Sequence, residues 1–426
     1  MGRDVSRLFI LTYSAILNAM FKSMSRDQRV MIIVLTLINF LNYLDRQVIF
    51  PLFSHLKLEF GLTDFHLGVI GTVFLVVQSL ATFPMGLLAD KISRKAIIAT
   101  GVAVWSIASF GSGLVNSFKG LLGMRAVVGA GEATYAPAAV AMITDNFPDK
   151  YNARIQGIFN VGMLVGGTSG AIIGGLVAFY FNNWRLAFFI VSIPGIILAL
   201  LALKLKDKRV VHDEPVLPLK SLIKNTAYIW IIISGTLISF ASGAFITWGI
   251  EFISRYKNYN VKDASLILGI GMMISSVIGV LIGSYVADWL HKKYAWGRSI
   301  VVAVSLLISA PLMFFGLADS TTFLFLVFFF SGAIFLSVYL GPVTAVLHDV
   351  VPKQFRASAF ALYVLFIHLV GEAFSPAIIG VISDKYSLRT GLEFATLFVF
   401  LAGLAFFPVA KIVAKKHSHI VATANE

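Results

Sequence analysis

Twelve apolar segments follow one another along almost the whole of this 426-residue chain, and each is long enough to cross a lipid bilayer as a helix. A bilayer-spanning helix takes about 20 apolar residues. Only 13% of the residues are charged, whereas a soluble domain carries about 25%. We therefore expect an all-α membrane protein with twelve transmembrane helices. The predicted spans are 30–54, 66–88, 96–115, 119–143, 155–181, 185–203, 227–254, 263–287, 299–318, 322–349, 358–383 and 390–410.

An internal repeat divides these spans into two sets of six. The sequence GLLADKISRK follows the second span, and its near-copy GSYVADWLHKK follows the eighth. A second repeat, an Asp-x-x-Pro-x-x-aromatic turn, follows the fourth span at Asp145 and the tenth at Asp349. Duplicated sets of spans are typical of secondary transporters. The repeats predict two pseudo-symmetric six-helix bundles.

The remaining chain forms short connecting segments. We expect a peripheral N-terminal segment at 1–29, bundles at 30–203 and 227–410, a basic linker at 204–226 and a tail at 411–426. An apolar run at 8–21 is too short to span a bilayer. It is interpreted as a surface-lying helix or a signal-like segment, unless the natural chain starts at Met24.

Lysine and arginine residues are distributed unequally between the two sides of the predicted membrane. The side that holds both termini carries 24 of the 34, and the other side carries 8. This bias predicts that both termini are cytoplasmic, and we expect a bacterial inner membrane. The net charge of +13 then faces an anionic lipid leaflet rather than a nucleic acid. The chain has no cysteine, which excludes disulfides and thiolate metal sites.

Ionisable residues inside a span are costly, so they usually face a cavity and carry function. Six residues qualify: Asp45, Arg46, Arg125, Glu132, His368 and Glu372. Counted from the ends of their spans, Asp45 lies about 21 Å from one surface and Arg125 about 9 Å from the other. In a core about 30 Å thick these two side chains share a level, and Glu132 lies about 10 Å deeper than Arg125. We expect Asp45 to pair with Arg125 and Glu132 to lie towards the midplane.

Glu132 is predicted to bind a proton, and Asp45, Arg46 and Arg125 are predicted to sense its state. Burial favours the protonated form of a carboxylic acid, and a nearby cation favours the ionised form. A permanent salt-bridge cluster that fixes helix packing is the alternative. His368 and Glu372, one turn apart, form a second proton relay, a substrate contact or a structural pair.

Two further features are interpreted structurally. Other carboxylates, including Asp64 and Asp145, fall in predicted loops, where solvation or helix capping is expected. The fifth span carries a face of glycines that permits close backbone approach. This face serves either static packing or a sliding contact between the two bundles. Its members are Gly162, Gly166, Gly167, Gly170, Gly174 and Gly175.

These motifs resemble those of the major facilitator superfamily over essentially the whole chain. The residues Gly86, Asp90, Arg94 and Lys95 match that family's loop 2–3 signature, and Arg125 matches a second family position. NYLDRQVI in the first span and GEATYAPAA in the fourth are similar to the spinster branch, which is associated with lysophospholipids and sphingoid lipids. Hexuronate-like organic-anion symporters have similar NYxDR helices, and multidrug exporters belong to the same superfamily.

The resemblance implies a proton-coupled carrier that works by alternating access. It implies a conformational latch in which Asp90 pairs with Arg94 or Arg154, and a weaker equivalent at Asp288, where Trp289 to His291 interrupt the basic spacing. It also implies that the seventh and tenth spans line the cavity. The expected substrate contacts are Arg46, Arg125, Glu132, His368, Glu372, Phe240, Trp248 and Tyr339.

The sequence contains no motif that is typical of an enzyme. GAGEAT at 129–134 lies inside an apolar span without a preceding strand, so it is not a phosphate loop. There is no P-loop lysine motif, HExxH or Cys-x-x-Cys. We expect no enzymatic activity, no cofactor and no metal. The expected partners are a small amphipathic or anionic substrate, protons and membrane lipid, and the expected oligomeric state is a monomer.

Overall fold

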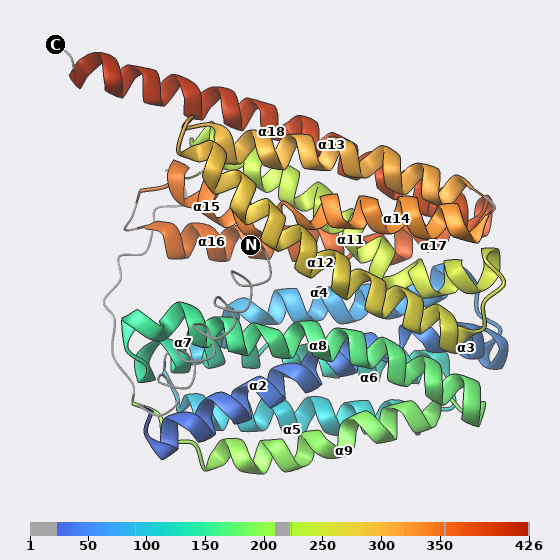
Figure 1. Ribbon diagram of the computed structural model, residues 1–426. Helices are drawn as coiled ribbons and strands as arrows, with labels where there is room; N and C mark the ends of the chain where they lie inside the picture. Colours follow the sequence, from blue (N-terminus) through green and yellow to red (C-terminus); the bar gives the residue numbers. More distant parts are fainter. Residues whose placement is uncertain are drawn as a thin grey trace, which may run out of the picture.

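The chain folds into a bundle of long helices in the computed structural model, which describes residues 24–89, 91–208, 222, 224–319, 321–352 and 355–424 (Figure 1). Regular structure in this part of the chain is helical throughout. The N-terminal run 8–21 and Asp90 lie outside the described residues. Twelve helical spans within the described ranges are long and apolar enough to cross a membrane.

The first half of the molecule holds six of these spans. Its helices are α2 (Arg26–Gln47), η1 (Phe50–Leu52), α3 (Phe53–Phe60), α4 (Asp64–Ala89), α5 (Arg94–Ser112), α6 (Phe118–Glu132), α7 (Tyr135–Asn146), α8 (Asp149–Phe181) and α9 (Arg185–Leu203). The fourth span is interrupted between α6 and α7, directly after Glu132. The first span continues through α3 to Phe60, beyond its predicted end at 54.

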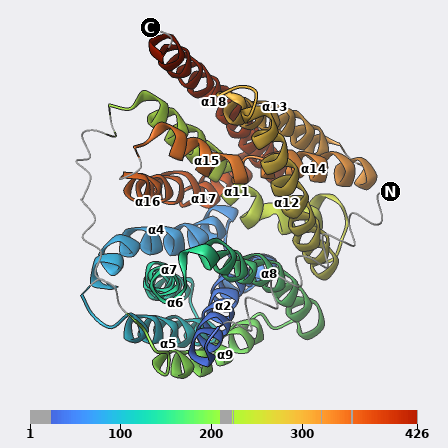
Figure 2. The same cartoon turned by 60° about the vertical axis from the view of Figure 1, so that its left-hand side comes forward.

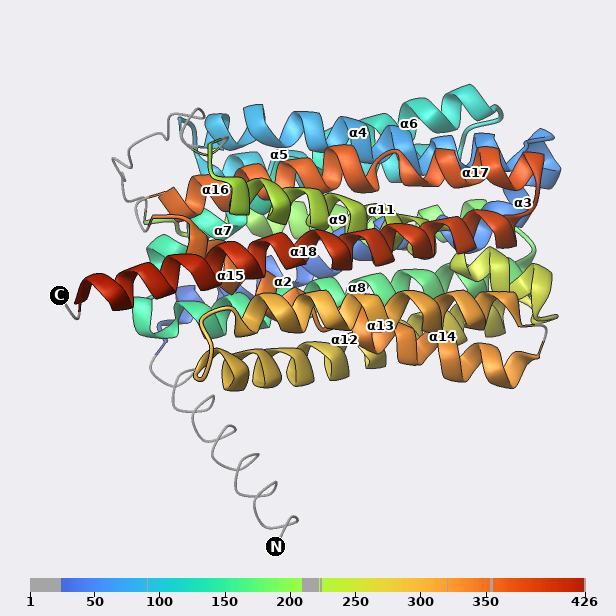
Figure 3. The same cartoon turned by 90° about the horizontal axis from the view of Figure 1, so that it is seen from above.

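The second half holds the other six spans. Its helices are α11 (Thr226–Tyr256), α12 (Val261–His291), α13 (Gly297–Ala318), α14 (Thr322–Ser337), α15 (Leu340–Val350), α16 (Arg356–Phe366), η3 (Ile367–Glu372), α17 (Ser375–Lys385) and α18 (Leu388–Ala424). The tenth span breaks between α14 and α15, as the fourth does between α6 and α7. Figure 3 shows α18 lying along α11 and α13, with which it packs.

Helix ends follow local sequence signals. Ser25 and Gln28 form a capping box at the start of α2, in which each side chain accepts a hydrogen bond from the other residue's backbone N–H. Helix α3 ends at Gly61, whose φ of +62° lies in the left-handed region that favours glycine. This turn brings the chain directly back into α4.

A row of glycines four residues apart packs α8 along α2. A Cβ added at any of them would lie within 2.6 Å of a backbone oxygen of α2. The pairs are Gly162 with Thr36, Gly166 with Phe40, Gly170 with Leu44 and Gly174 with Val48. Both helices belong to the first half, so this row serves static packing. Gly175 alone of the face contacts the second half, at Ser265 and Val261 of α12.

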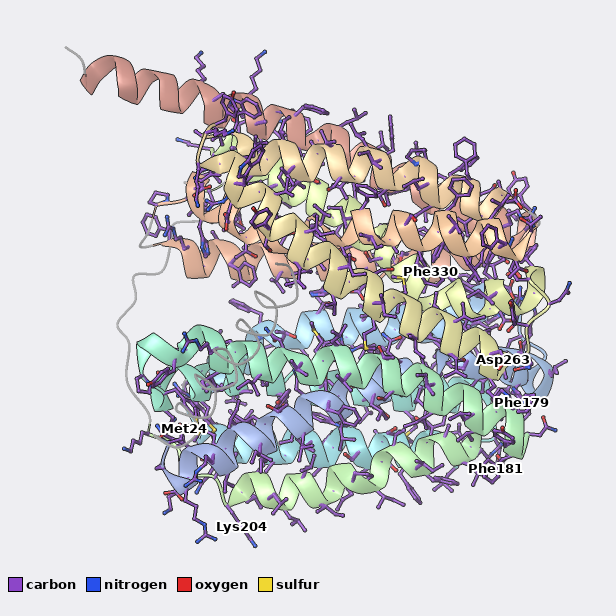
Figure 4. All side chains as sticks on the ribbon, in the orientation of Figure 1. Met24, Phe179, Phe181, Lys204, Asp263 and Phe330 are labelled. Carbon is purple, nitrogen blue, oxygen red and sulfur yellow. The ribbon has the colours of Figure 1, made fainter. Side chains whose placement is uncertain are left out.

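The two ends of the bundle differ. Met24 and Lys204 lie at one end, which we call the linker end, and Phe179 and Asp263 lie at the opposite end (Figure 4). The main contacts between the halves are α4 with α17 and α8 with α12 (Figure 2). Their closest points, Gly68 against Pro376 and Gly175 against Ser265, lie towards the opposite end. The halves are therefore held together at that end.

Candidate functional site

Helix α2 presents Asp45 and Arg46 near its end. Consecutive residues of an α-helix point about 100° apart, so the two side chains meet different neighbours. Asp45 faces α5 and α6 inside the first half, whereas Arg46 faces the end of α6 and the interface with the second half. The two residues therefore belong to two separate ion pairs.

The first pair joins Asp45 to Arg125 and is buried. Oδ2 of Asp45 lies 3.6 Å from Nη1 of Arg125, and only 3% and 1% of these residues are exposed. Ser109 of α5 donates its hydroxyl to the other carboxylate oxygen of Asp45. Removing one member of such a buried pair would leave an uncompensated charge, which costs about 3–5 kcal/mol. The pair fixes α2, α5 and α6 relative to one another.

The second pair joins Arg46 to Glu132. Nη2 of Arg46 lies 3.0 Å from Oε2 of Glu132, and Nε2 of Gln78 donates to the same oxygen over 3.1 Å. Oε1 of Glu132 is buried without a hydrogen-bond partner among the residues that the structure describes. Oε2 thus accepts both hydrogen bonds, and Oε1 has the capacity to take a proton.

Phe74 of α4 lies between the two arginines. The centre of its ring is 5.2 Å from the guanidinium carbon of Arg46 and 5.3 Å from that of Arg125. Arg46 also lies 4.6 Å from the ring centre of Tyr43. Aromatic faces attract cations, and the attraction grows when water is excluded. Phe74 therefore packs both cations in an apolar setting and connects the two ion pairs.

A cavity of about 20 Å³ lies where the two halves meet beside Arg46. A volume of this size holds about one water molecule. Its wall comes from both halves, so the cavity changes whenever the halves move. The lining residues are Arg46, Gln47, Phe50, Gly71, Phe74, Leu75, Gly243, Ile246, Thr247 and Glu372.

Glu372 brings the second half's charge to this cavity. It ends η3, a π-helical turn between α16 and α17, and its Oε2 lies 2.5 Å from Nδ1 of His368. Such turns occur frequently at functional sites. The side chain of His368 is 42% exposed and that of Glu372 17%. Arg46 therefore has one carboxylate in its own half at 3.0 Å and a second carboxylate on the facing wall.

Two of the three aromatic residues expected at the cavity lie elsewhere. Phe240 stacks on Phe398 of α18, with ring centres 4.1 Å apart, so it faces away from the first half. Trp248 is fully buried, packs on Phe53 and donates to the backbone oxygen of Pro376, so it belongs to the contact between the halves. Tyr339, between α14 and α15, is half-buried.

Of the residues expected to form the conformational latch, Arg94 and Asp288 form ion pairs inside their own halves, and Asp90 lies outside the described residues. Nη1 of Arg94 lies 2.6 Å from Oδ2 of Asp145, with both side chains buried, so solvation was the wrong expectation for Asp145. Arg154 is exposed. Asp288 pairs with Arg298 at 2.8 Å, and Arg298 also reaches Asp349 at 3.1 Å. In the second half, the cation that pairs with Asp288 is therefore Arg298, which follows the interrupted basic spacing at 289–291.

Sequence reasoning missed Gln78, Ser109 and Phe74. Gln78 is an amide inside an otherwise apolar helix, and that signal was present in the sequence. Nothing in the sequence separates Ser109 from the other serines of α5, or Phe74 from the other 36 phenylalanines. Across the described ranges, no group of three or more His, Asp or Glu side chains is placed to hold a metal ion.

Comparison with known proteins gives one consistent result. The family model of the Major Facilitator Superfamily matches residues 35–308 and 277–422. Protein spinster of Drosophila melanogaster is 29% identical over 389 residues, which cover 87% of this chain and 64% of that protein. Protein spinster homolog 1 of Xenopus laevis is 30% identical over 383 residues, which cover 84% of this chain and 73% of that protein.

The fold is also shared with a solved structure. The crystal structure of a bacterial homolog to the human lysosomal transporter spinster, in an inward-facing and occupied conformation, matches with a TM-score of 0.82. The match has 22% sequence identity and covers 91% of this chain and 98% of that one. These relatives are transporters rather than enzymes. The chain therefore belongs to the Major Facilitator Superfamily and, within it, to the spinster branch of membrane transporters.

Proposed function

We propose that this protein is a proton-coupled secondary transporter that works by alternating access, with Glu132 as the proton-binding group. The observation that carries the proposal is the Arg46–Glu132 ion pair, buried at the wall of a cavity between the halves. An ionisable pair in the membrane interior is costly to keep, and such groups mark ion and proton pathways.

The geometry suggests how a proton would act. The four charges of Asp45, Arg46, Arg125 and Glu132 cancel while both carboxylates are ionised. When Glu132 takes a proton, Arg46 loses its nearest counter-charge, and the carboxylate of Glu372 on the facing wall becomes its remaining attraction. That attraction pulls the halves together around the cavity. Proton binding is thereby linked to closure at the linker end.

Transport in proteoliposomes tests this assignment. Glu132→Gln keeps the size of the side chain and removes its proton site, so uptake should no longer respond to an imposed pH gradient. Glu393→Gln is the matched control, because Glu393 lies half-buried in α18, a membrane-spanning helix of the second half. Full pH-gradient coupling in Glu132→Gln would refute the assignment. Loss of coupling in both variants would show a general effect of removing intramembrane carboxylates.

For the substrate, we propose an amphipathic lipid such as a lysophospholipid or a sphingoid lipid. The support is membership of the spinster branch, together with charged groups of both signs at the cavity. Competition binding with lysolipids, hexuronates and cationic dyes separates this class from an organic-anion symporter or a multidrug exporter. Tighter binding of a hexuronate or a dye than of any lysolipid would overturn the lipid proposal.

The orientation follows from the distribution of basic residues. We propose that the linker end and both termini face the cytoplasm, as expected for a bacterial inner-membrane protein. The contacts that hold the halves together at the opposite end then correspond to an inward-facing state. Labelling of single cysteines introduced at the linker end and at the opposite end, in intact cells, tests this orientation.

A further inference from the structure

The opposite end of the molecule carries a charged cluster that the transport site does not use. Its centre is Asp64, the first residue of α4, which is 3% exposed. Nζ of Lys57, in the same half, donates to its carboxylate over 2.6 Å. From the second half, Arg255 donates to both carboxylate oxygens over 2.6 and 2.9 Å, and Ser383 donates over 2.5 Å. Solvation or simple capping was therefore the wrong expectation for Asp64.

A second carboxylate, from the second half, binds backbone groups of the first half. Asp384 of α17 accepts the backbone N–H groups of Asp64 and Phe65, each over 2.8 Å. These are the first donors of α4, and the N-terminal N–H groups of a helix have no partner inside the helix. A carboxylate at this position also complements the helix dipole. Each half thus supplies a carboxylate that the other half satisfies.

A third carboxylate extends the cluster towards α3. Glu251 of α11 is 3% exposed, accepts from Nε of Arg255 over 2.8 Å and accepts the hydroxyl of Ser54 over 2.8 and 3.1 Å. Arg255 therefore binds carboxylates of both halves with one guanidinium. Hydrogen bonds to ionised groups are roughly twice as strong as those between neutral groups.

Close backbone contact makes these interactions form or break together. A Cβ at Gly68 would lie 2.2 Å from the backbone oxygen of Pro376, and a Cβ at Gly380 would lie 2.5 Å from that of Asp64. The backbones of α4 and α17 are therefore in direct contact at the cluster and again one turn further along α4. A small separation of these helices removes partners of the buried carboxylate of Asp64 and of the first N–H groups of α4 at once, which is costly unless water enters.

We propose that Asp64, Glu251, Arg255, Ser383 and Asp384, with Ser54 and Lys57, form an ionic lock that holds the opposite end closed, and that release of this lock is a required step whenever that end opens. The lock is independent of which residue binds the proton and of which substrate is carried.

Because the chain has no cysteine, a single Ser265→Cys variant provides a direct probe. Ser265 is fully buried where α12 meets Gly175 of α8, so its labelling by a water-soluble maleimide in lipid nanodiscs reports opening of this end. Adding Asp64→Asn removes one charge of the lock and leaves Lys57 and Arg255 facing each other. We expect labelling to become about tenfold faster or more, and Ser383→Ala to give a smaller increase.

Glu59→Gln is the matched control. Glu59 pairs with Arg185 at 2.7 Å at the same end, but both residues belong to the first half. Glu59→Gln should leave the labelling rate of Ser265→Cys unchanged. Unchanged labelling in Asp64→Asn and in Ser383→Ala would overturn the lock, and so would equal acceleration in Glu59→Gln.

A second measurement separates release of the lock from loss of folding. Labelling is compared at a temperature well below the unfolding midpoint of each variant, and the fraction that elutes as folded protein is measured at the same time.

A double-mutant cycle tests whether two members of the lock act together. It compares the parent with Asp64→Asn, Arg255→Gln and the double variant. If Asp64 and Arg255 act in one lock, the effects of the two changes on the labelling rate are non-additive, because either change removes the same contact. Additive effects would refute the direct coupling of these two residues.

Discussion

The glycine row of α8 gives the sharpest stability prediction, at Gly166. A Cβ at this position would lie 2.2 Å from the backbone oxygen of Phe40, whereas ordinary contact starts at 3.4 Å. Gly166→Ala therefore requires α2 and α8 to separate by roughly 1 Å, because a backbone oxygen cannot rotate away as a side chain does. Overpacking of this kind costs about 1–3 kcal/mol.

Gly157 offers a control on the same helix. A Cβ there meets no atom within 4 Å, so Gly157→Ala keeps only the helix-propensity gain of alanine over glycine, about 1 kcal/mol. Thermal unfolding in detergent, followed by the fraction that elutes as folded protein, should give a lower midpoint for Gly166→Ala than for the parent. Gly157→Ala should unfold at the same or a higher temperature.

The same change has a functional consequence, since α2 also carries Arg46. Displacement of α2 alters the 3.0 Å contact between Arg46 and Glu132, so Gly166→Ala should reduce pH-driven uptake more than Gly157→Ala does. Equal unfolding midpoints for the two alanine variants would refute the packing argument, because helix propensity alone treats the two glycines alike.

The charged contacts at the linker end should differ in strength. Arg94→Gln removes a cation from a buried carboxylate, Asp145, and should lower stability by about 3–5 kcal/mol, while Arg154→Gln, at an exposed residue, should change it by less than about 0.5 kcal/mol. Asp288→Asn breaks a pair whose aspartate is 62% exposed, so we expect a loss below about 1 kcal/mol. Unfolding midpoints of the three variants check this order, and an equal loss in Arg94→Gln and Asp288→Asn would contradict it.

The sequence predicts the spans well because a span depends on the length and polarity of one continuous segment. The paired repeats likewise predict two related halves. Depth also follows from counting, since a helix rises by a fixed amount per residue. That is why the sequence predicts Asp45 and Arg125 at one level. In the structure, Oδ2 of Asp45 lies 3.6 Å from Nη1 of Arg125.

Partners that lie far apart in the sequence could not be predicted in the same way. Asp64 contacts Arg255 and Ser383, which are 191 and 319 residues away. Nothing near Asp64 in the chain separates it from a solvated loop carboxylate, because its burial is produced by the second half. The aromatic residues of α11 illustrate the same limit. The length and polarity of the seventh span predict that Phe240 and Trp248 lie on one helix. Contacts with neighbouring helices determine which way the two side chains point, and neither lines the cavity.

The adjacency of Asp45 and Arg46 suggests a division of labour that composition alone does not reveal. The side chains of Asp45 and Arg125 are 4% and 1% exposed, so their pair is shielded from solvent and is suited to holding helices in place. The side chain of Arg46 is 13% exposed and lines the cavity, so in the proposed mechanism its pair with Glu132 is the one that responds to a proton. Under this proposal, α2 carries a static charge at Asp45 and a proton-responsive charge at Arg46. Because Asp45 neighbours Arg46 on α2, a movement of α2 that opened the second pair would also displace the first pair, which contacts α5 and α6.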